Sequence, residues 1–155
     1  MKKKFNANFM KQAIELSEIA CIIKKTGGAF GAIVEKNNKI IGEGYNQVIA
    51  QNDPTWHAEI QALREAGKAI GSFDLKGTTL YASTQPCPMC LSAAYLANID
   101  HIFYGATNDQ ALQFSPSRQQ DFFKEICKKE NQIITSTQVM ETEALEIWKK
   151  FSEQV

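Results

Sequence analysis

The chain has 155 residues, of which 44% are hydrophobic and 22% charged, and its 17 basic residues balance 17 acidic ones. This length predicts one domain, 1–155, that buries a normal core without disulfide bridges. A net charge of zero excludes the strongly basic surface of a dedicated nucleic-acid-binding protein, although it does not exclude a local basic patch.

The hydrophobic pattern predicts helices and strands in the order α-β-β-α-β-α-β-α-β-α. Glycines that follow apolar stripes mark the helix ends, and Asp53-Pro54-Thr55 is a start signal for the second helix. The predicted helices span residues 9–25, 56–70, 88–97, 118–129 and 143–151. The predicted strands span residues 29–35, 39–45, 78–83, 102–104 and 133–135. Residues 46–52 and 106–117 are interpreted as loops.

The order of these elements predicts the fold. The first two strands are joined by a tight turn at Asn37-Asn38, which is typical of a β-hairpin. The later strands are separated by helices of about 10–15 residues, which implies crossover connections and parallel pairing. We therefore expect an α/β protein: a three-layer α/β/α sandwich around a five-stranded mixed sheet, with the hairpin as its antiparallel edge.

The N-terminus and the cysteines indicate where such a protein is found. Lys2-Lys3-Lys4 resembles the basic start of a signal peptide, but polar residues interrupt the apolar core that should follow. No stretch approaches the roughly 20 apolar residues of a membrane span. Cys21 and Cys127 lie in apolar, helix-like stretches and are interpreted as buried hydrophobic residues. With thiols kept reduced for metal binding, we expect a soluble, cytoplasmic protein without a membrane partner.

Two short motifs carry the candidate chemistry. His57 is separated from Glu59 by one residue, and Cys87 and Cys90 form a Cys-x-x-Cys pair further along the chain. One imidazole nitrogen and two thiolates suit a tetrahedral zinc ion whose fourth position holds water, as in catalytic zinc sites. A redox dithiol or a closed zinc knuckle is the alternative, but the first needs no histidine and the second needs a fourth protein ligand. His101 is interpreted as a surface or packing residue.

Glu59 adds a proton carrier to this site. Alone, a glutamate in the first turn of a helix only complements the helix dipole. Beside a zinc ligand it can take a proton from a water molecule and return it to a leaving nitrogen. His-x-Glu combined with Pro-Cys-x-x-Cys is the signature of zinc-dependent nucleobase deaminases. The sequence therefore predicts one zinc ion per chain, held by His57, Cys87 and Cys90, and hydrolytic deamination with Glu59 as catalytic residue.

The chain resembles the cytidine/deoxycytidylate deaminase superfamily over nearly its whole length, and within it the bacterial guanine deaminases. Residues 27–34 resemble their first strand, and residues 52–59 and 86–91 resemble their two zinc segments. This resemblance implies a cytidine-deaminase-like fold and conversion of guanine, or a related amino-purine, to its oxo product with release of ammonia. It also implies a homodimer in which the region from about Ser117 onward lies near the partner's site.

The same resemblance implies the substrate contacts. Asn46, assisted by the backbone N–H of Ala58, would bind the base carbonyl, because a side-chain amide offers both a donor and an acceptor. Phe30 would stack on the ring of the base. A turn residue is the alternative interpretation of Asn46, and a core residue that of Phe30.

Four positions depart from the guanine deaminase pattern. Phe114 and Ser115 stand where the family has an aspartate that accepts hydrogen bonds from guanine, and we expect the Ser115 hydroxyl to replace part of that function. The other departures are Leu96 in place of an aromatic residue, Gln85 in place of a glutamate, and a chain that ends at Val155 without the family's tyrosine. These changes leave the reaction in place and affect the choice of substrate.

Three other interpretations use the same residues. A tRNA adenosine deaminase shares the catalytic parts but needs phosphate contacts, which zero net charge and the acidic side chains near the C-terminus disfavour. A cytosine or nucleoside deaminase is a second alternative. A non-catalytic, zinc-stabilised binding module is the third, and it predicts no role for Glu59. The apolar stripe of residues 143–151, with Leu145, Trp148 and Phe151, is interpreted as a surface that a partner subunit covers.

Overall fold

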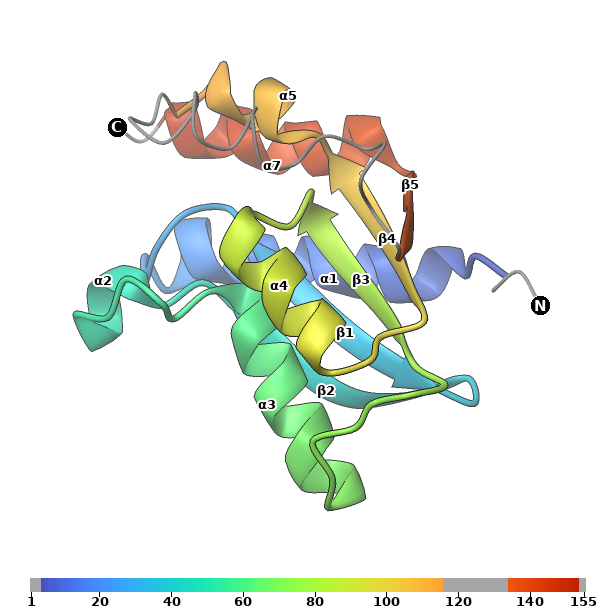
Figure 1. Cartoon of the computed structure of the whole chain (residues 1–155). Helices are drawn as coiled ribbons and strands as arrows, with labels where there is room; N and C mark the ends of the chain where they lie inside the picture. The colour runs from blue at the N-terminus through green and yellow to red at the C-terminus, as the bar shows by residue number, and fades with distance from the viewer. Residues whose placement is uncertain (1–3, 116–133, 154–155) are drawn as a thin grey trace.

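The sheet has five strands in the order β2-β1-β3-β4-β5 in the computed structural model, which describes residues 4–115 and 134–153 (Figure 1). The strands are β1 (Gly31–Lys36), β2 (Lys39–Tyr45), β3 (Thr79–Thr84), β4 (His101–Ala106) and β5 (Thr135–Gln138). β1 pairs antiparallel with β2 and with β3, whereas β3, β4 and β5 run parallel. The predicted mixed sheet with an antiparallel hairpin at its edge is therefore confirmed.

Helices cover both faces of this sheet. Figure 1 shows α3 and α4 in front of the sheet, α1 behind it, and α7 with α5 along one end. The helices are α1 (Ala7–Glu18), α2 (Val48–Gln51), α3 (Ala58–Ile70), α4 (Pro88–Leu96), α5 (Asn108–Leu112) and α7 (Glu141–Ser152). Among the described residues, none of the helices is both long enough and apolar enough to cross a membrane.

Successive side chains of a strand point to opposite faces of the sheet, so the core consists of two clusters, one on each face. On β1, Ile33 packs toward α1 and α7, whereas its neighbours Ala32 and Val34 pack toward α3 and α4. This period of two is expected of a strand buried on both faces. The predicted α/β/α sandwich is confirmed.

Two glycines on β2 allow α3 to lie unusually close to the sheet. A Cβ atom on Gly44 would collide with the carbonyl oxygen of Ala58, and one on Gly42 with that of Ala62. Both alanines are fully buried. Because backbone meets backbone here, the N-terminal turn of α3 is held firmly against the hairpin.

Two segments that were expected to be loops contain short helices. Residues 48–51 form α2, which ends at Asn52 in the left-handed region with φ 51°. Residues 108–112 form α5, and the Thr107 and Gln110 side chains make a reciprocal capping box at its start. The Thr-x-x-Gln spacing of that box is the sequence pattern that could have indicated the start of α5. A helix this short carries too little apolar periodicity to be recognised otherwise.

Other predicted boundaries shift. The first helix was expected over residues 9–25, but α1 ends at Glu18 and continues as one turn of π-helix, Ile19–Ile23. The last strand is Thr135–Gln138 rather than 133–135, and the last helix is two residues longer at its start than expected. Cys21 is buried as expected. The predicted helix over 118–129, with Cys127, lies outside the described residues.

Candidate metal centre and active site

His57 lies at the N-cap of α3 and is placed by the turn that precedes it. Thr55 donates hydrogen bonds from its backbone N and its Oγ1 to Asp53 Oδ1, at 2.8 and 2.7 Å. The backbone N of His57 then donates to the carbonyl of Thr55 at 2.8 Å. The helix begins at Ala58, not at residue 56 as expected, because His57 itself is extended (φ −79°, ψ 154°). Asp53 therefore stabilises the turn before the helix and does not cap the helix.

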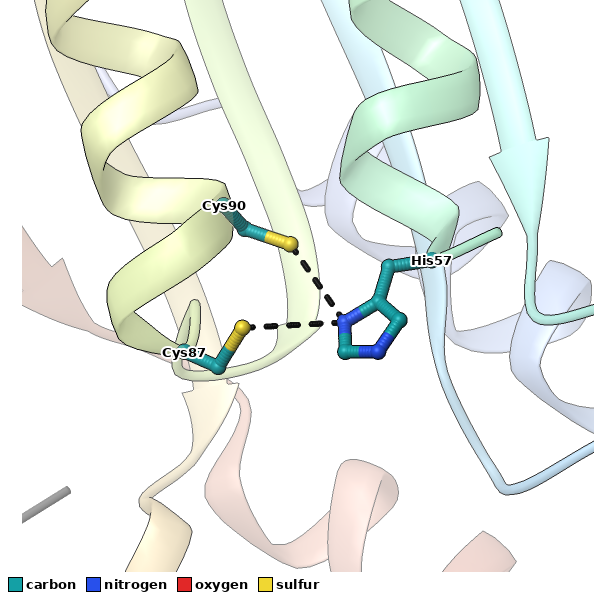
Figure 2. A group of neighbouring side chains, drawn as sticks. All are labelled: His57, Cys87 and Cys90. Atoms are coloured by element: carbon teal, nitrogen blue, oxygen red, sulfur yellow. Dashed lines mark hydrogen bonds between the residues drawn. The ribbon is translucent and has the colours of Figure 1, made fainter. Parts of the chain in front are cut away.

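The two cysteines occupy the first turn of α4. Cys87 is the N-cap, Pro88 follows at the first helical position, and Cys90 comes two residues later. Residues at this spacing share one side of a helix. Figure 2 shows both thiols directed toward the imidazole of His57. The N-terminus of a helix stabilises thiolates, the form in which cysteine binds metals.

The three ligand atoms have the spacing of a zinc site. The Sγ atoms of Cys87 and Cys90 lie 3.6 and 3.5 Å from His57 Nδ1. All three atoms lie within 4.8 Å of one another. Zinc ligated tetrahedrally at its usual bond lengths separates a nitrogen and a sulfur ligand by roughly 3.6 Å. Both cysteines are free, so no disulfide competes for the thiols. The residues therefore fit one zinc ion.

Hydrogen bonds from neighbouring side chains favour the thiolate form of Cys87, one of the two cysteine ligands. A hydrogen bond from Cys90, together with one from His57, outweighs burial and lowers the pKa of Cys87 to about 4. The same bond, together with burial, raises the pKa of Cys90. Burial lowers the pKa of His57, but the contact with Cys87 and the charge of Glu59 outweigh burial, so this pKa is raised. Metal binding at such a site displaces protons from the thiol and the imidazole.

Glu59 lies beside these ligands in the first turn of α3. Its side chain is 3% exposed, and among the described residues Oε2 has no hydrogen-bond partner. Burial, followed by the negative charge of Cys87, raises the pKa of Glu59 to about 7. A buried carboxylate oxygen without a partner is costly unless another group binds there. Its position indicates a functional rather than a structural carboxylate.

A pocket of about 290 Å³ opens beside the ligands and Glu59. Its metal side consists of His57, Glu59, Gln85 and Cys87. The remaining walls come from the segment before β1 (Gly28, Phe30), from α5 and its end (Asn108, Ala111, Leu112, Ser115) and from α7 (Trp148, Phe151). The pocket therefore lies where segments from most of the described chain meet, and most of its wall is apolar.

The structure divides the expected substrate contacts into two groups. Phe30 and Ser115 line the pocket. Asn46 is 4% exposed and is not among the lining residues; its backbone N donates to Phe30 O at 3.0 Å and its Oδ1 accepts from Val48 N at 3.1 Å. Ala58 is fully buried in the core, and Phe114 packs against the core cluster shared by α1 and α7.

The expectation that α7 presents an apolar face to a partner is wrong for Trp148, the one of its three residues that is buried within its own chain. Trp148 is 4% exposed and packs within its own chain, and Phe151 is half-buried against it. Both line the pocket, a position the sequence did not predict. An apolar helical stripe shows that a face is covered but not what covers it.

Known proteins share this arrangement. Residues 3–106 match the family model described as the cytidine and deoxycytidylate deaminase zinc-binding region. Guanine deaminase of Bacillus subtilis is 41% identical over 93% of this chain and 94% of its own. A tRNA-specific adenosine deaminase of Buchnera aphidicola is 36% identical over 97% and 96%. The X-ray structure of the Bacillus subtilis guanine deaminase superposes with a TM-score of 0.73 at 37% identity, covering 97% and 95% of the two chains.

Three findings agree on the family: the spacing of the His57, Cys87 and Cys90 ligand atoms, the superposition on the guanine deaminase structure, and a family match that covers both zinc motifs. The chain belongs to the zinc-binding cytidine and deoxycytidylate deaminase family and is a deaminase.

Proposed function

We propose that this protein hydrolyses a free amino-purine, with guanine as the first candidate, so that guanine and water give xanthine and ammonia. One observation carries the proposal: a pocket of about 290 Å³ joins the metal ligands and Glu59 to aromatic walls. Aromatic walls suit a flat heterocycle, and the volume lies at the lower end of ordinary ligand pockets. The relative that is 41% identical and named a guanine deaminase supports the choice of base.

The chain's own residues hold the metal and move the proton. His57, Cys87 and Cys90 would hold zinc, which supplies a Lewis acid that lowers the pKa of water toward about 7. Glu59 is the proton carrier in this proposal: its carboxylate accepts a proton from the attacking water and donates it to the departing amine nitrogen. Its unpartnered Oε2 on the pocket side of α3 supports this assignment.

The remaining contacts of the proposal orient the base. The ring of Phe30 lies nearly parallel to the imidazole of His57, at an interplanar angle of 11° with centroids 6.4 Å apart. We assign Phe30 to stacking on the base. Ser115 supplies a hydroxyl in the pocket wall. Asn46 and the backbone of Ala58 are not among the residues that line the pocket, and we assign them to the base carbonyl on the family resemblance alone.

A polynucleotide substrate fits this pocket less well. No lysine or arginine lines it in the described ranges, 4–115 and 134–153. Phosphate contacts dominate the affinity of nucleic-acid-binding proteins, so a tRNA deaminase needs such cations around its site. The tRNA-specific relatives keep tRNA as the alternative substrate to be tested.

The purified protein is expected to release ammonia from guanine, and more slowly or not at all from cytosine, nucleosides and tRNA. The measurement is steady-state ammonia release over this panel at equal enzyme concentration, with 2-aminopurine and adenine as further free purines. Turnover of tRNA or pyrimidines without turnover of any free purine would contradict the proposal.

Gly27→Ala is expected to weaken guanine turnover by displacing Asn46. A Cβ at position 27 would overlap Asn46 Oδ1, so the carboxamide must turn away. Losing one hydrogen bond to the base corresponds to about 1–3 kcal/mol, hence roughly a 5- to 150-fold fall in kcat/KM for either Gly27→Ala or Asn46→Ala. The double variant should be no worse than either single one, because both remove the same contact.

Gln12→Ala on α1 is the control, since it removes an exposed side-chain amide from a residue that does not line the pocket. Additive losses in the double variant would show that Asn46 is not the group through which Gly27 acts.

We also propose that the protein is a cytoplasmic homodimer. Its thiol ligands need a reducing compartment. A groove of about 410 Å³ between α3 and α4 is flanked by Phe73 and Leu96, which are 84% and 80% exposed. One patch that offers both projecting side chains and a groove suits the self-complementary interface of a two-fold dimer. This surface replaces the α7 face expected from the sequence.

Light scattering at micromolar concentration is expected to give the mass of two chains for the wild type and of one chain for Leu96→Glu. Ile23→Glu is the matched control, because Ile23 is 67% exposed on the opposite side of the sheet. A monomeric wild type, or equal dissociation by both variants, would contradict the proposed interface.

A further inference from the structure

One wall of the pocket is an indole ring fixed by a buried hydrogen bond. Trp148 Nε1 donates to Thr84 Oγ1 at 3.0 Å, and both side chains are buried. The indole meets Phe30 edge-on, with centroids 5.0 Å apart and an interplanar angle of 85°. It meets Phe151 in the same manner, at 5.9 Å and 82°. The hydrogen bond and the two ring contacts together define one orientation of the indole.

This wall and the reacting end of the pocket are formed by different elements. The metal ligands and Glu59 come from the N-terminal turns of α3 and α4. Trp148 comes from α7, which packs with α1 in the other core cluster (Figure 1). A purine loses its amino group from the six-membered ring, so a base with that ring at Glu59 directs its five-membered ring toward α5 and α7. In nucleosides the five-membered ring carries the sugar.

The space on that side is limited. The whole pocket measures about 290 Å³, and Trp148, Phe151 and Leu112 line it with apolar side chains. A ribosyl group placed against Trp148, Phe151 and Leu112 would bring its hydroxyls against apolar side chains, which offer them no hydrogen bonds. A site rejects a ribosyl group when its hydroxyls give up hydrogen bonds to water on binding and find no new ones in the pocket.

We propose that Trp148 is a specificity-determining residue that selects free bases over nucleosides and polynucleotides, and that Thr84 is the positioning residue that fixes its indole. Thr84 ends β3, three residues before Cys87, so the specificity wall is anchored to the strand that leads into the metal site. The inference rests on the proposed function, because it requires a free base as substrate.

Trp148→Phe and Trp148→Ala are expected to raise the ratio of nucleoside to base turnover. The measurement is kcat/KM for guanine and guanosine, adenine and adenosine, and cytosine and cytidine, with zinc content and melting temperature recorded for each variant. The ratio should rise about 10-fold or more in Trp148→Ala, since opening a pocket wall changes selectivity by that order. Trp148→Phe keeps an aromatic ring in the wall and should show the same direction with a smaller change.

Substitutions of Thr84 test whether the orientation of the Trp148 indole, and not only its size, determines the selectivity. Thr84→Val keeps the shape but removes the acceptor, whereas Thr84→Ser keeps the hydroxyl. The valine variant should shift the ratio in the direction of Trp148→Ala and change the emission of Trp148, measured in a Trp56→Phe background, while the serine variant stays near the wild type. Equal behaviour of the two variants would overturn the role of Thr84.

These measurements distinguish failure of the specificity role of Trp148 from failure of the proposed function. If the wild type turns over a free base and Trp148→Ala, with zinc bound and fold intact, leaves the ratio unchanged, the specificity role is overturned and the proposed function stands. If Trp148→Ala does not fold, Trp148→Phe decides the same question. If the wild type turns over nucleosides or tRNA but no free base, both are overturned.

Discussion

Glu59→Gln is expected to lower kcat by about 10²- to 10⁴-fold, the usual contribution of a general acid–base group, while zinc content stays at one ion per chain. Glutamine has the shape of glutamate and fits the same buried space, but its amide cannot accept and return a proton. Stability should not fall, because the change removes a buried ionisable group whose Oε2 has no partner among the described residues. The measurements are single-substrate kinetics by ammonia release, elemental analysis and thermal unfolding.

Glu65→Gln is the matched control for this experiment. It makes the same substitution on the same helix, at a glutamate whose side chain is 46% exposed and forms an ion pair with Lys68 at 2.9 Å. Its kcat should equal that of the wild type. A Glu59→Gln enzyme with near-normal kcat would mean that another group moves the proton, and the assignment of Glu59 would be wrong.

Cys90→Ala is expected to abolish both zinc binding and turnover. Two protein ligands hold zinc far more weakly than three, and the metal is the Lewis acid of the reaction. The wild type should contain one zinc ion per chain by elemental analysis. A strong chelator should lower its melting temperature, because a ligand that binds only the folded state stabilises it, and added zinc should restore turnover.

Cys21→Ala is the matched control, since it removes a second buried thiol in the core between α1 and α7, away from the metal site. This variant loses a comparable side-chain volume but should keep its zinc and its kcat. Full zinc occupancy in Cys90→Ala, or turnover that survives complete removal of zinc, would contradict the ligand set of His57, Cys87 and Cys90.

The metal centre is the part of the site that the sequence predicted best. Its ligands lie in two short segments whose local conformation is set nearby: the Asp53–Thr55 turn places His57, and the first turn of α4 places both cysteines. Parallel strands then bring the starts of their following helices to one edge of the sheet. Local signals and one topological rule are enough to bring the three ligands together.

Strands β1 to β4 were likewise predictable from sequence, because apolar runs bounded by turn residues mark them, whereas the polar strand β5 (Thr135–Gln138) was misplaced. Short and irregular elements were not. α2 and α5 are too short for a periodic pattern, and the π-helical turn at the end of α1 differs from an α-helix only in hydrogen bonding. Asp53 was assigned to the wrong position because a cap residue and a turn residue use the same side chain for similar hydrogen bonds.

By itself the sequence determined the zinc ligand set, the order of the strands and the family resemblance, since these depend on residue type and short spacing; it also predicted Glu59 as the proton carrier. The tertiary structure alone decided the walls of the pocket. Trp148 lies 64 residues beyond Thr84 in the chain, yet their side chains share a hydrogen bond. That contact depends on how α7 packs against β4, where Gly105 allows its close approach. Such packing is a property of the whole core, so an apolar stripe on α7 could not show whether its tryptophan faces a partner, the core or the substrate.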